Sequence, residues 1–297
     1  MEEEALTKVE IKHFKNKKKN QKKETIIKII IYLICLLVSF ASGLLIGTKM
    51  KIRKNPEKIN RTNIKKLDFN NFTSYSQYLE DFVLYCIFYD IENGFYIDVG
   101  ANDPNHISVS KYFYLNGWHG MNIEPLPDMY QKLLTYRNRD INLNIGAGEK
   151  DDILPLYMQN VGSTLNKMYS KNISQVINIT VHPMSKICKM HMPKNEEIQF
   201  CKIDVEGYEK YVLLGYDFEN YRPKVFCIES TKPGTINPLH KEWENILLKN
   251  GYAFGFKYVI NRFYYDTKVD YLKERFLNLE NNMKEYKESR KRKKKLI

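Results

Sequence analysis

The chain has 297 residues, of which 43% are hydrophobic and 13% aromatic, and its formal net charge is +12. This length fits one α/β domain beside a short N-terminal segment, and the apolar content excludes a wholly disordered chain. Much of the positive charge lies in two lysine-rich ends, residues 8–23 and 287–295. No RNA- or DNA-binding motif accompanies these ends, which disfavours a nucleic-acid partner and favours a role in topology or at a lipid surface.

The cysteines are odd in number, and no C-x-x-C spacing occurs among Cys35, Cys86, Cys188, Cys201 and Cys227. The sequence therefore indicates neither a disulfide framework nor a zinc site. Cys201 and Cys227 fall in or beside apolar strand-like runs, so we expect them to be small buried side chains. No metal-ligand cluster is predicted, although oxygen ligands for a divalent ion leave no tight spacing signature.

An apolar segment at residues 26–48 follows the basic residues 1–24. It is uncharged from Ile29 to Thr48, which is close to the roughly 20 residues that span a bilayer core, and Lys28 can snorkel to the interface. A cleaved signal peptide is the alternative, but its apolar core usually has about 7–15 residues. We predict a single-pass transmembrane helix and a membrane location. Basic residues flank both ends of the segment, so the side that holds the domain stays open.

From Ser74 onward the hydrophobic pattern becomes regular. Apolar periodicity predicts helices near residues 74–90, 108–113, 206–214 and 243–249, and strands at 95–99, 117–124, 140–145, 200–205, 224–229, 252–256 and 262–265. Several strands are apolar throughout, which is typical of a parallel sheet covered by helices on both faces. We predict one α/β domain, with a mostly parallel sheet and a closing strand pair. The expected segments are a juxtamembrane linker at 49–73, the domain at 74–270 and a helical basic tail at 271–297.

The ends of two predicted strands point to a nucleoside ligand. The strand at 95–99 delivers Asp98 and then Gly100 to the carboxyl edge of the sheet, where open parallel sheets bind ligands. Glycine there permits positive φ and a close approach of the ligand. Glu124 ends the next strand, where a carboxylate can accept both hydroxyls of a ribose. Neither G-x-G-x-x-G nor G-x-x-x-x-G-K-[ST] occurs, so we expect an adenosyl ligand without phosphates.

Further acidic residues follow the fourth and fifth strands. Asp204, Glu206 and Glu229 lie at or just beyond the carboxyl ends of these strands, where a carboxylate could take a proton from an attacking hydroxyl. They could also merely orient the substrate, because methyl transfer can need little beyond in-line positioning. Glu206 could instead simply open the following helix. His106 and His182 are the other candidate bases, although a lone loop histidine is more often only solvated.

Six segments, spread over roughly residues 74–265, carry a resemblance to a known family. In order they are YSQYLED (75–81), FYIDVGANDP (95–104), GWHGMNIEP (117–125), GSTL (162–165), KIDVEGYE (202–209) and RPKVFCIES (222–230). Together they resemble the FkbM family of S-adenosylmethionine-dependent methyltransferases. The resemblance implies a Rossmann-like methyltransferase fold, S-adenosylmethionine as cofactor, and usually O-methylation of a sugar or other small hydroxyl compound.

The resemblance also assigns residues to the cofactor site. It implies that Asp98, Gly100, Ala101 and Asn102 line the cofactor and that Glu124 binds its ribose. The chain departs from the family pattern in two places. Leucine at position 79 stands where the family usually has a glycine, and VHPM at 181–184 replaces a threonine-containing stretch.

The sequence thus predicts a membrane-anchored methyltransferase that acts on a hydroxyl of a glycan, a lipid-linked sugar or a similar small molecule. Two alternatives remain. One is a catalytically silent, membrane-anchored binding or trafficking module, against which the retained Asp98, Gly100, Glu124 and Asp204 argue. The other is a membrane-tethered nucleic-acid methyltransferase, which the basic tail and the altered segment at 181–184 would suit.

Overall fold

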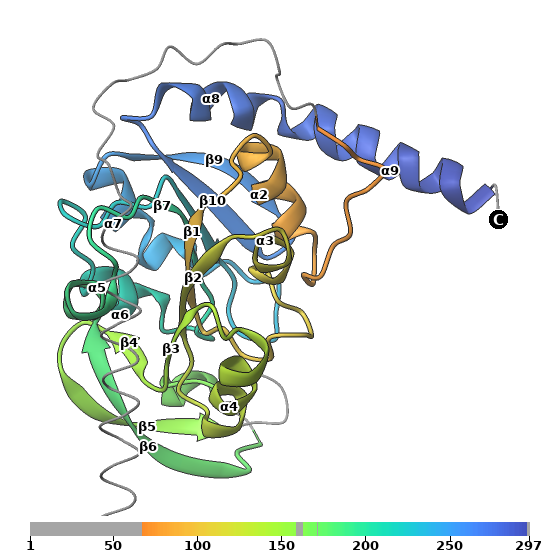
Figure 1. The fold of residues 1–297 in the computed structure, drawn as a ribbon. Helices are drawn as coiled ribbons and strands as arrows, with labels where there is room; N and C mark the ends of the chain where they lie inside the picture. The colour runs from red at the N-terminus through yellow and green to blue at the C-terminus, as the bar shows by residue number, and fades with distance from the viewer. Residues whose placement is uncertain (1–66, 159–162, 171, 296–297) are drawn as a thin grey trace, which may run out of the picture. The chain divides into compact units, whose positions relative to one another are not determined.

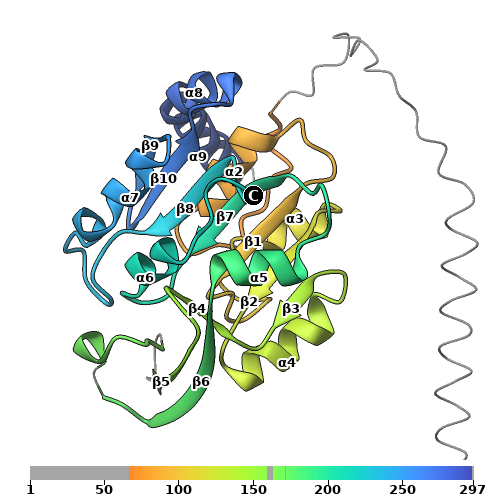
Figure 2. The ribbon, with the colours of Figure 1, turned by 90° about the vertical axis from the view of Figure 1, so that its left-hand side faces the viewer.

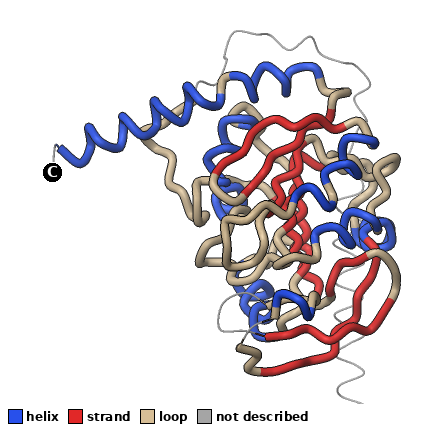
Figure 3. The backbone as a smooth tube through the Cα atoms, turned by 180° about the vertical axis from the view of Figure 1, so that it is seen from behind, coloured by secondary structure: helices blue, strands red, loops and turns tan. Residues whose placement is uncertain are grey.

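A seven-stranded sheet with the strand order β3-β2-β1-β7-β8-β10-β9 forms the centre of the domain (Figure 3). The computed structural model describes residues 67–158, 163–170 and 172–295, which belong to one unit comprising residues 63–297. The first five strands of the sheet run parallel, and β10 runs antiparallel between β8 and β9. The strands are β1 (Phe95–Val99), β2 (His119–Ile123), β3 (Ile141–Leu143), β7 (Ile198–Ile203), β8 (Val225–Glu229), β9 (Tyr252–Tyr258) and β10 (Asn261–Asp266).

Helices cover both faces of this sheet, as Figure 1 shows. Every residue of β1, β7 and β8 is buried, and alternate side chains enter two separate hydrophobic cores. One core is closed by α5 (Met184–His191), α6 (Glu209–Leu214) and α7 (Glu244–Lys249). The other is closed by α2 (Glu80–Phe88), α3 (Lys111–Leu115), α8 (Asp270–Leu277) and α9 (Leu279–Lys295). The prediction of an α/β fold with a mostly parallel sheet is confirmed.

A second, three-stranded sheet was not predicted from the sequence. It consists of β4 (Gly146–Gly148), β6 (Gln175–Pro183) and β5 (Asp152–Met158), in that order, and Figure 2 shows its long β5–β6 pair curving away from the main sheet. Most of β5 and β6 is at least partly exposed, and β5 contains a proline. Neither β5 nor β6 therefore has the continuous apolar run by which a buried strand is predicted from sequence. Helix α4 (Pro127–Tyr136) packs beside β3.

The predicted helix at 74–90 begins only at Glu80. The carboxylate of Asp81 accepts hydrogen bonds from the Ser74 and Ser76 hydroxyls and from the backbone N–H of Tyr75, at 2.6–2.7 Å, and so holds these residues in a loop. The loop enters the helix through Leu79, whose φ is +67°. This is the left-handed region, which glycine adopts without steric cost and leucine does not.

We therefore expect Leu79→Gly to be more stable than Leu79→Ala by about 1 kcal/mol, the reverse of the usual order in helices. Both variants lose the leucine side chain, so their difference isolates the backbone strain. Chemical denaturation of the two variants measures it. Equal stability, or a more stable alanine variant, would show that the backbone at this position is not strained.

The predicted basic tail is two helices, and its first part belongs to the core. Leu279, Met283 and Tyr286 of α9 are buried, and the Tyr286 ring stacks on Phe82 of α2 at 4.1 Å between centroids. The predicted membrane segment at 26–48, with the basic residues before it, lies outside the described residues. Among the helices that the structure does describe, none is both long enough and apolar enough to cross a membrane.

Candidate active site

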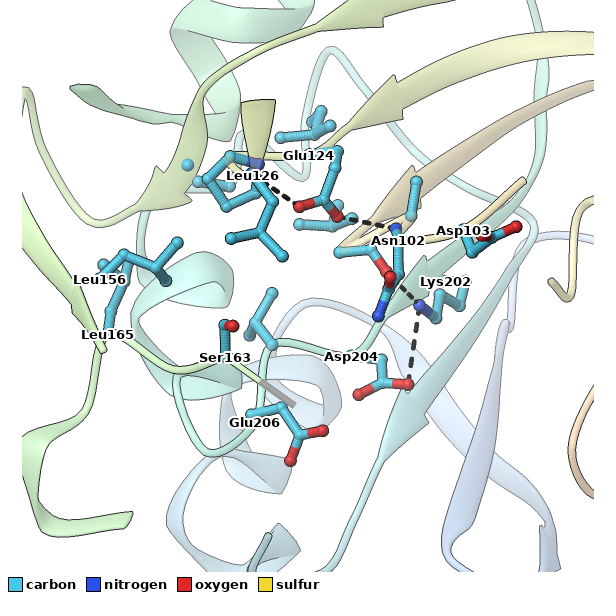
Figure 4. A pocket seen from close by; sticks show the side chains of 18 of the residues that line it. Asn102, Asp103, Glu124, Leu126, Leu156, Ser163, Leu165, Lys202, Asp204 and Glu206 are labelled. Carbon is cyan, nitrogen blue, oxygen red and sulfur yellow. Dashed lines mark hydrogen bonds and ion pairs between the residues drawn. The ribbon is translucent and has the colours of Figure 1, made fainter. Parts of the chain in front are cut away.

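A cavity of about 250 Å³ lies at the carboxyl ends of β1, β2 and β7 (Figure 4). From β1 the chain continues to β2 on one side, and β7 pairs with β1 on the other, so the strand order reverses at this point. Open α/β sheets bind their ligands at such a switch point. The lining includes the predicted residues Gly100, Ala101, Asn102, Glu124, Asp204 and Glu206.

Gly100 allows the ends of β1 and β7 to meet. Its φ is +74°, and a Cβ atom at this position would lie 2.0 Å from the backbone oxygen of Asp204. On the other side, the N–H of Gly100 donates to the carbonyl of Ile123 at 3.0 Å. No residue with a side chain fits between these two backbones without shifting one of them. The glycine predicted from sequence is therefore required for the close approach of three strand ends.

Glu124 presents a fixed carboxylate to the cavity. Its side chain is buried and accepts hydrogen bonds from the backbone N–H groups of Asn102 at 2.7 Å and Leu126 at 2.8 Å. Burial raises the pKa of Glu124 above its ordinary value, while these two bonds oppose the shift. Each carboxylate oxygen accepts one of these two bonds and has capacity for another. The arrangement can therefore accept two hydroxyl groups of a ligand.

Asp98 was predicted to line the cofactor, but it is not among the residues that line the cavity. It is 1% exposed and lies behind Gly100, where it accepts a hydrogen bond from the Ser110 hydroxyl at 2.8 Å. Its other oxygen lies 3.4 Å from the ammonium nitrogen of Lys202. Alternate residues of a strand point to opposite faces of a sheet. The side chain of Asp98 consequently points toward α3, and only the backbone beyond it reaches the cavity.

Lys202 is a site residue that the sequence reasoning missed. Its Nζ donates to the carbonyl oxygen of Gly100 at 2.7 Å and lies 3.6 Å from a carboxylate oxygen of Asp204. Burial disfavours the charge, but Asp98 and Asp204 outweigh it and raise the pKa of Lys202 above its ordinary value. The sequence feature that could have identified this residue is a lysine inside an otherwise apolar strand. It pairs in register with Asp98 on β1.

Two of the three predicted catalytic acids reach the cavity. Asp204 and Glu206 line it, and Figure 4 shows them on a different side from Glu124. Burial raises the pKa of Glu206 to about 7, and Asp204 adds to this shift while Lys202 opposes it. Glu229 is buried, does not line the cavity, and has one carboxylate oxygen without a hydrogen-bond partner among the described residues. Burial and the neighbouring acids raise the pKa of Glu229 far above its ordinary value.

A short segment after β5 closes one side of the cavity. Ser163 and Leu165 line it, while the hydroxyl of Thr164 donates to the backbone oxygen of Glu206 at 2.7 Å. Asn166 adds a weaker bond, from its amide nitrogen to the backbone oxygen of Gly207 at 3.3 Å. The conformation of the loop that carries Glu206 thus depends on a segment about 40 residues earlier in the chain.

A comparison with family models matches more than half of the chain. A family model described as the methyltransferase FkbM domain matches residues 98–254, which include the carboxyl end of β1 and all of β2 and β7. This chain belongs to the FkbM methyltransferase family. The family predicted from the sequence is confirmed, and the match supports a methyltransferase.

A crystal structure of the FkbM methyltransferase from Methylobacillus flagellatus KT is similar at 17% sequence identity, with a TM-score of 0.38. The alignment covers 59% of this chain and 44% of that chain, so this chain matches less than half of that protein's length. No curated protein matches the chain.

In this FkbM family member, Glu209 positions the loop that bears Glu206. One of its carboxylate oxygens accepts from the backbone N–H groups of Val205 at 3.2 Å and Gly207 at 3.0 Å. The side chain is fully buried, and burial raises the pKa of Glu209 to about 8. The neutral acid is therefore the form that the folded protein favours at neutral pH.

We expect Glu209→Gln to flatten the pH dependence of stability. Because the folded pKa lies above the ordinary 4.5, the stabilising contribution is present below pH 4.5 and is lost as the pH rises through 8. The free energy of unfolding should fall between pH 5 and 8, and the glutamine should remove about 3 kcal/mol of that fall. Urea titrations at several pH values measure this, with the exposed Glu219→Gln as the matched control. A parallel pH dependence in both variants would show that Glu209 does not titrate there.

The two histidines considered as bases lie in different places. His106 lines the cavity, whereas His182 on β6 does not and pairs with the carboxylate of Asp151 at 2.6 Å. The altered segment at 181–184 forms the end of β6 and the start of α5. None of its residues lines the cavity. In the part of the chain that the structure describes, no group of three or more histidines, cysteines or acids could hold a metal ion.

Proposed function

We propose that this protein transfers a methyl group from S-adenosylmethionine to a hydroxyl of a sugar, glycan or other small molecule presented at a membrane. The observation that carries the proposal is the Glu124 carboxylate, fixed by two backbone N–H groups at the wall of a cavity at the switch point. The cavity loop after β1 has no phosphate-binding motif, which favours an adenosyl ligand over a dinucleotide.

The lining residues suit such a cofactor. Glu124 can accept the ribose hydroxyls, and the backbone of residues 100–102 leaves room for close contact because Gly100 has no side chain. Apolar side chains of Ile123, Leu126 and Leu156 line the same cavity and suit a planar base. The membrane part of the proposal depends on the sequence of residues 26–48 alone.

The chain's own residues supply positioning and a proton acceptor. S-adenosylmethionine, when bound, supplies the electrophilic methyl group. Glu206 faces the cavity with a pKa of about 7, so it is partly ionised at neutral pH and can accept the proton of an acceptor hydroxyl. Asp204 can accept a hydrogen bond from a second hydroxyl and so fix the orientation of the acceptor. Lys202 keeps its charge and holds the two strand ends that form the floor.

The proposed role of Glu206 predicts a pH profile. Only the ionised carboxylate can accept a proton, so the rate of methyl transfer should rise with pH through about 7 and then level off. Glu206→Gln should lower the rate by about 100-fold and remove this step. Transfer of radiolabelled methyl groups to a glycolipid extract measures both effects, with Glu219→Gln as control. An unchanged profile would exclude Glu206 as the base, and cofactor binding without transfer to any extract would favour a silent binding module.

A further inference from the structure

The last helix is fixed to the domain almost to its end. Beyond the buried Tyr286, the guanidinium of Arg290 donates to the backbone oxygen of Phe72 at 2.7 Å. One turn further, the ammonium of Lys293 donates to the backbone oxygen of Asn70 at 2.6 Å. These contacts lie on the same side of α9 as its buried residues. They determine which side of the helix faces the domain and which faces solvent.

The outward side of this segment is strongly basic. Residues 290–295 are all arginine or lysine, and no acidic residue follows Glu288. Lys287, Lys291 and Arg292 are exposed, and the side chain of Arg292 is 77% exposed although it lies 3.6 Å from Glu288. We call residues 287–295 the basic end of α9. The domain thus presents the exposed cations Lys287, Lys291 and Arg292 on a helix that packing holds in place.

This basic end lies beside the point where the N-terminal residues join the domain. Its two inward contacts are to residues 70 and 72, at the beginning of the described chain. Residues 49–66 separate that point from the predicted membrane segment at 26–48, and they can span at most about 60 Å. They are themselves rich in lysine and arginine, with one glutamate. A chain anchored through 26–48 would therefore carry the basic end on the part of the domain that is tethered.

We propose that the basic end of α9 binds an anionic phospholipid surface next to the tether. Lysine and arginine near an anionic leaflet are attracted electrostatically, and clusters of them bind phosphatidylserine and phosphoinositide surfaces. Proteins that hold single-stranded nucleic acid combine positive charge with aromatic side chains that stack on the bases. The one aromatic residue of α9, Tyr286, is buried against Phe82 instead. The proposal concerns orientation at the membrane and does not depend on the identity of the cofactor or acceptor.

The test measures the distance from α9 to lipid in the full-length chain. A fluorescent donor is attached at Glu285→Cys in a Cys35→Ser background, since the four described cysteines are buried. Energy transfer to headgroup-labelled lipid is compared in neutral phosphatidylcholine vesicles and in vesicles with phosphatidylserine. We expect higher transfer with phosphatidylserine, reduced by high salt. The variant Lys291→Glu/Arg292→Glu/Lys294→Glu/Lys295→Glu should lower the apparent membrane association of α9 at least about tenfold.

The matched control reverses four exposed lysines elsewhere, at positions 150, 189, 194 and 241, and should keep the phosphatidylserine effect. Equal transfer with both lipids would overturn the proposal, as would an equal loss in the control variant. Binding to single-stranded RNA that requires the basic end, without any response to phosphatidylserine, would also overturn it and assign the basic end to nucleic acid.

Discussion

Replacing Glu124 by glutamine should weaken the binding of S-adenosylmethionine about 100-fold. The substitution keeps the size of the side chain and one oxygen that can accept from a backbone N–H group. It removes the negative charge and the second acceptor oxygen. Two hydrogen bonds from ligand hydroxyls to a carboxylate contribute roughly 3 kcal/mol more than bonds to a neutral amide, which corresponds to this factor. Equilibrium dialysis with labelled cofactor measures the dissociation constant.

The matched control for this experiment is Glu149→Gln, which changes an exposed glutamate in the loop after β4. It should leave the affinity unchanged. Glu124 also holds the backbone of Asn102 and Leu126, so thermal unfolding of each variant is needed to show that the loop is intact. A normal affinity in folded Glu124→Gln would mean that this carboxylate does not receive the ligand hydroxyls.

Lys202→Met should lower the free energy of unfolding by about 3–5 kcal/mol. Methionine replaces the apolar part of the lysine side chain but removes the only cation that lies within 4 Å of Asp98 among the described residues. It also removes the donor to the Gly100 carbonyl. A buried carboxylate left without its partner is costly, because the full desolvation penalty remains. Urea unfolding measures the change.

A double-mutant cycle separates this penalty from lost packing. In Asp98→Asn/Lys202→Met the buried charge is gone, so the double variant should recover about 2 kcal/mol relative to the sum of the single substitutions. Additive effects would show that Asp98 and Lys202 do not stabilise each other. In that case the role of Lys202 would be limited to the backbone contact with Gly100.

The sequence was sufficient to predict the site residues that directly follow buried strands. Gly100 and Glu124 follow apolar runs that are buried on both faces, and the carboxyl ends of parallel strands share one edge. Two residues that follow neighbouring parallel strands therefore lie close together at that edge, as Gly100 and Glu124 do. The left-handed backbone at Leu79 was not predicted, because the apolar periodicity extended the expected helix back to residue 74.

The parts that could not be predicted depend on side-chain direction and on distant segments. Asp98 and Gly100 are close in sequence, but the Asp98 side chain is buried between Ser110 and Lys202 and does not line the cavity. Glu229 is the last residue of β8 and Glu124 directly follows β2, yet only Glu124 lines the cavity. The contact of Thr164 with the Glu206 loop joins segments 42 residues apart, and hydrophobic periodicity carries no information on such pairs.

The most direct test of the proposed cofactor site is a calorimetric titration of the wild-type chain with S-adenosylmethionine, S-adenosylhomocysteine, ATP and NAD. A cavity with a carboxylate for ribose and no phosphate cradle should bind the two adenosyl sulfur compounds saturably with one site per chain. It should bind ATP and NAD far more weakly. Tighter binding of ATP or NAD, or no binding of S-adenosylmethionine by folded protein, would contradict the assignment of this cavity.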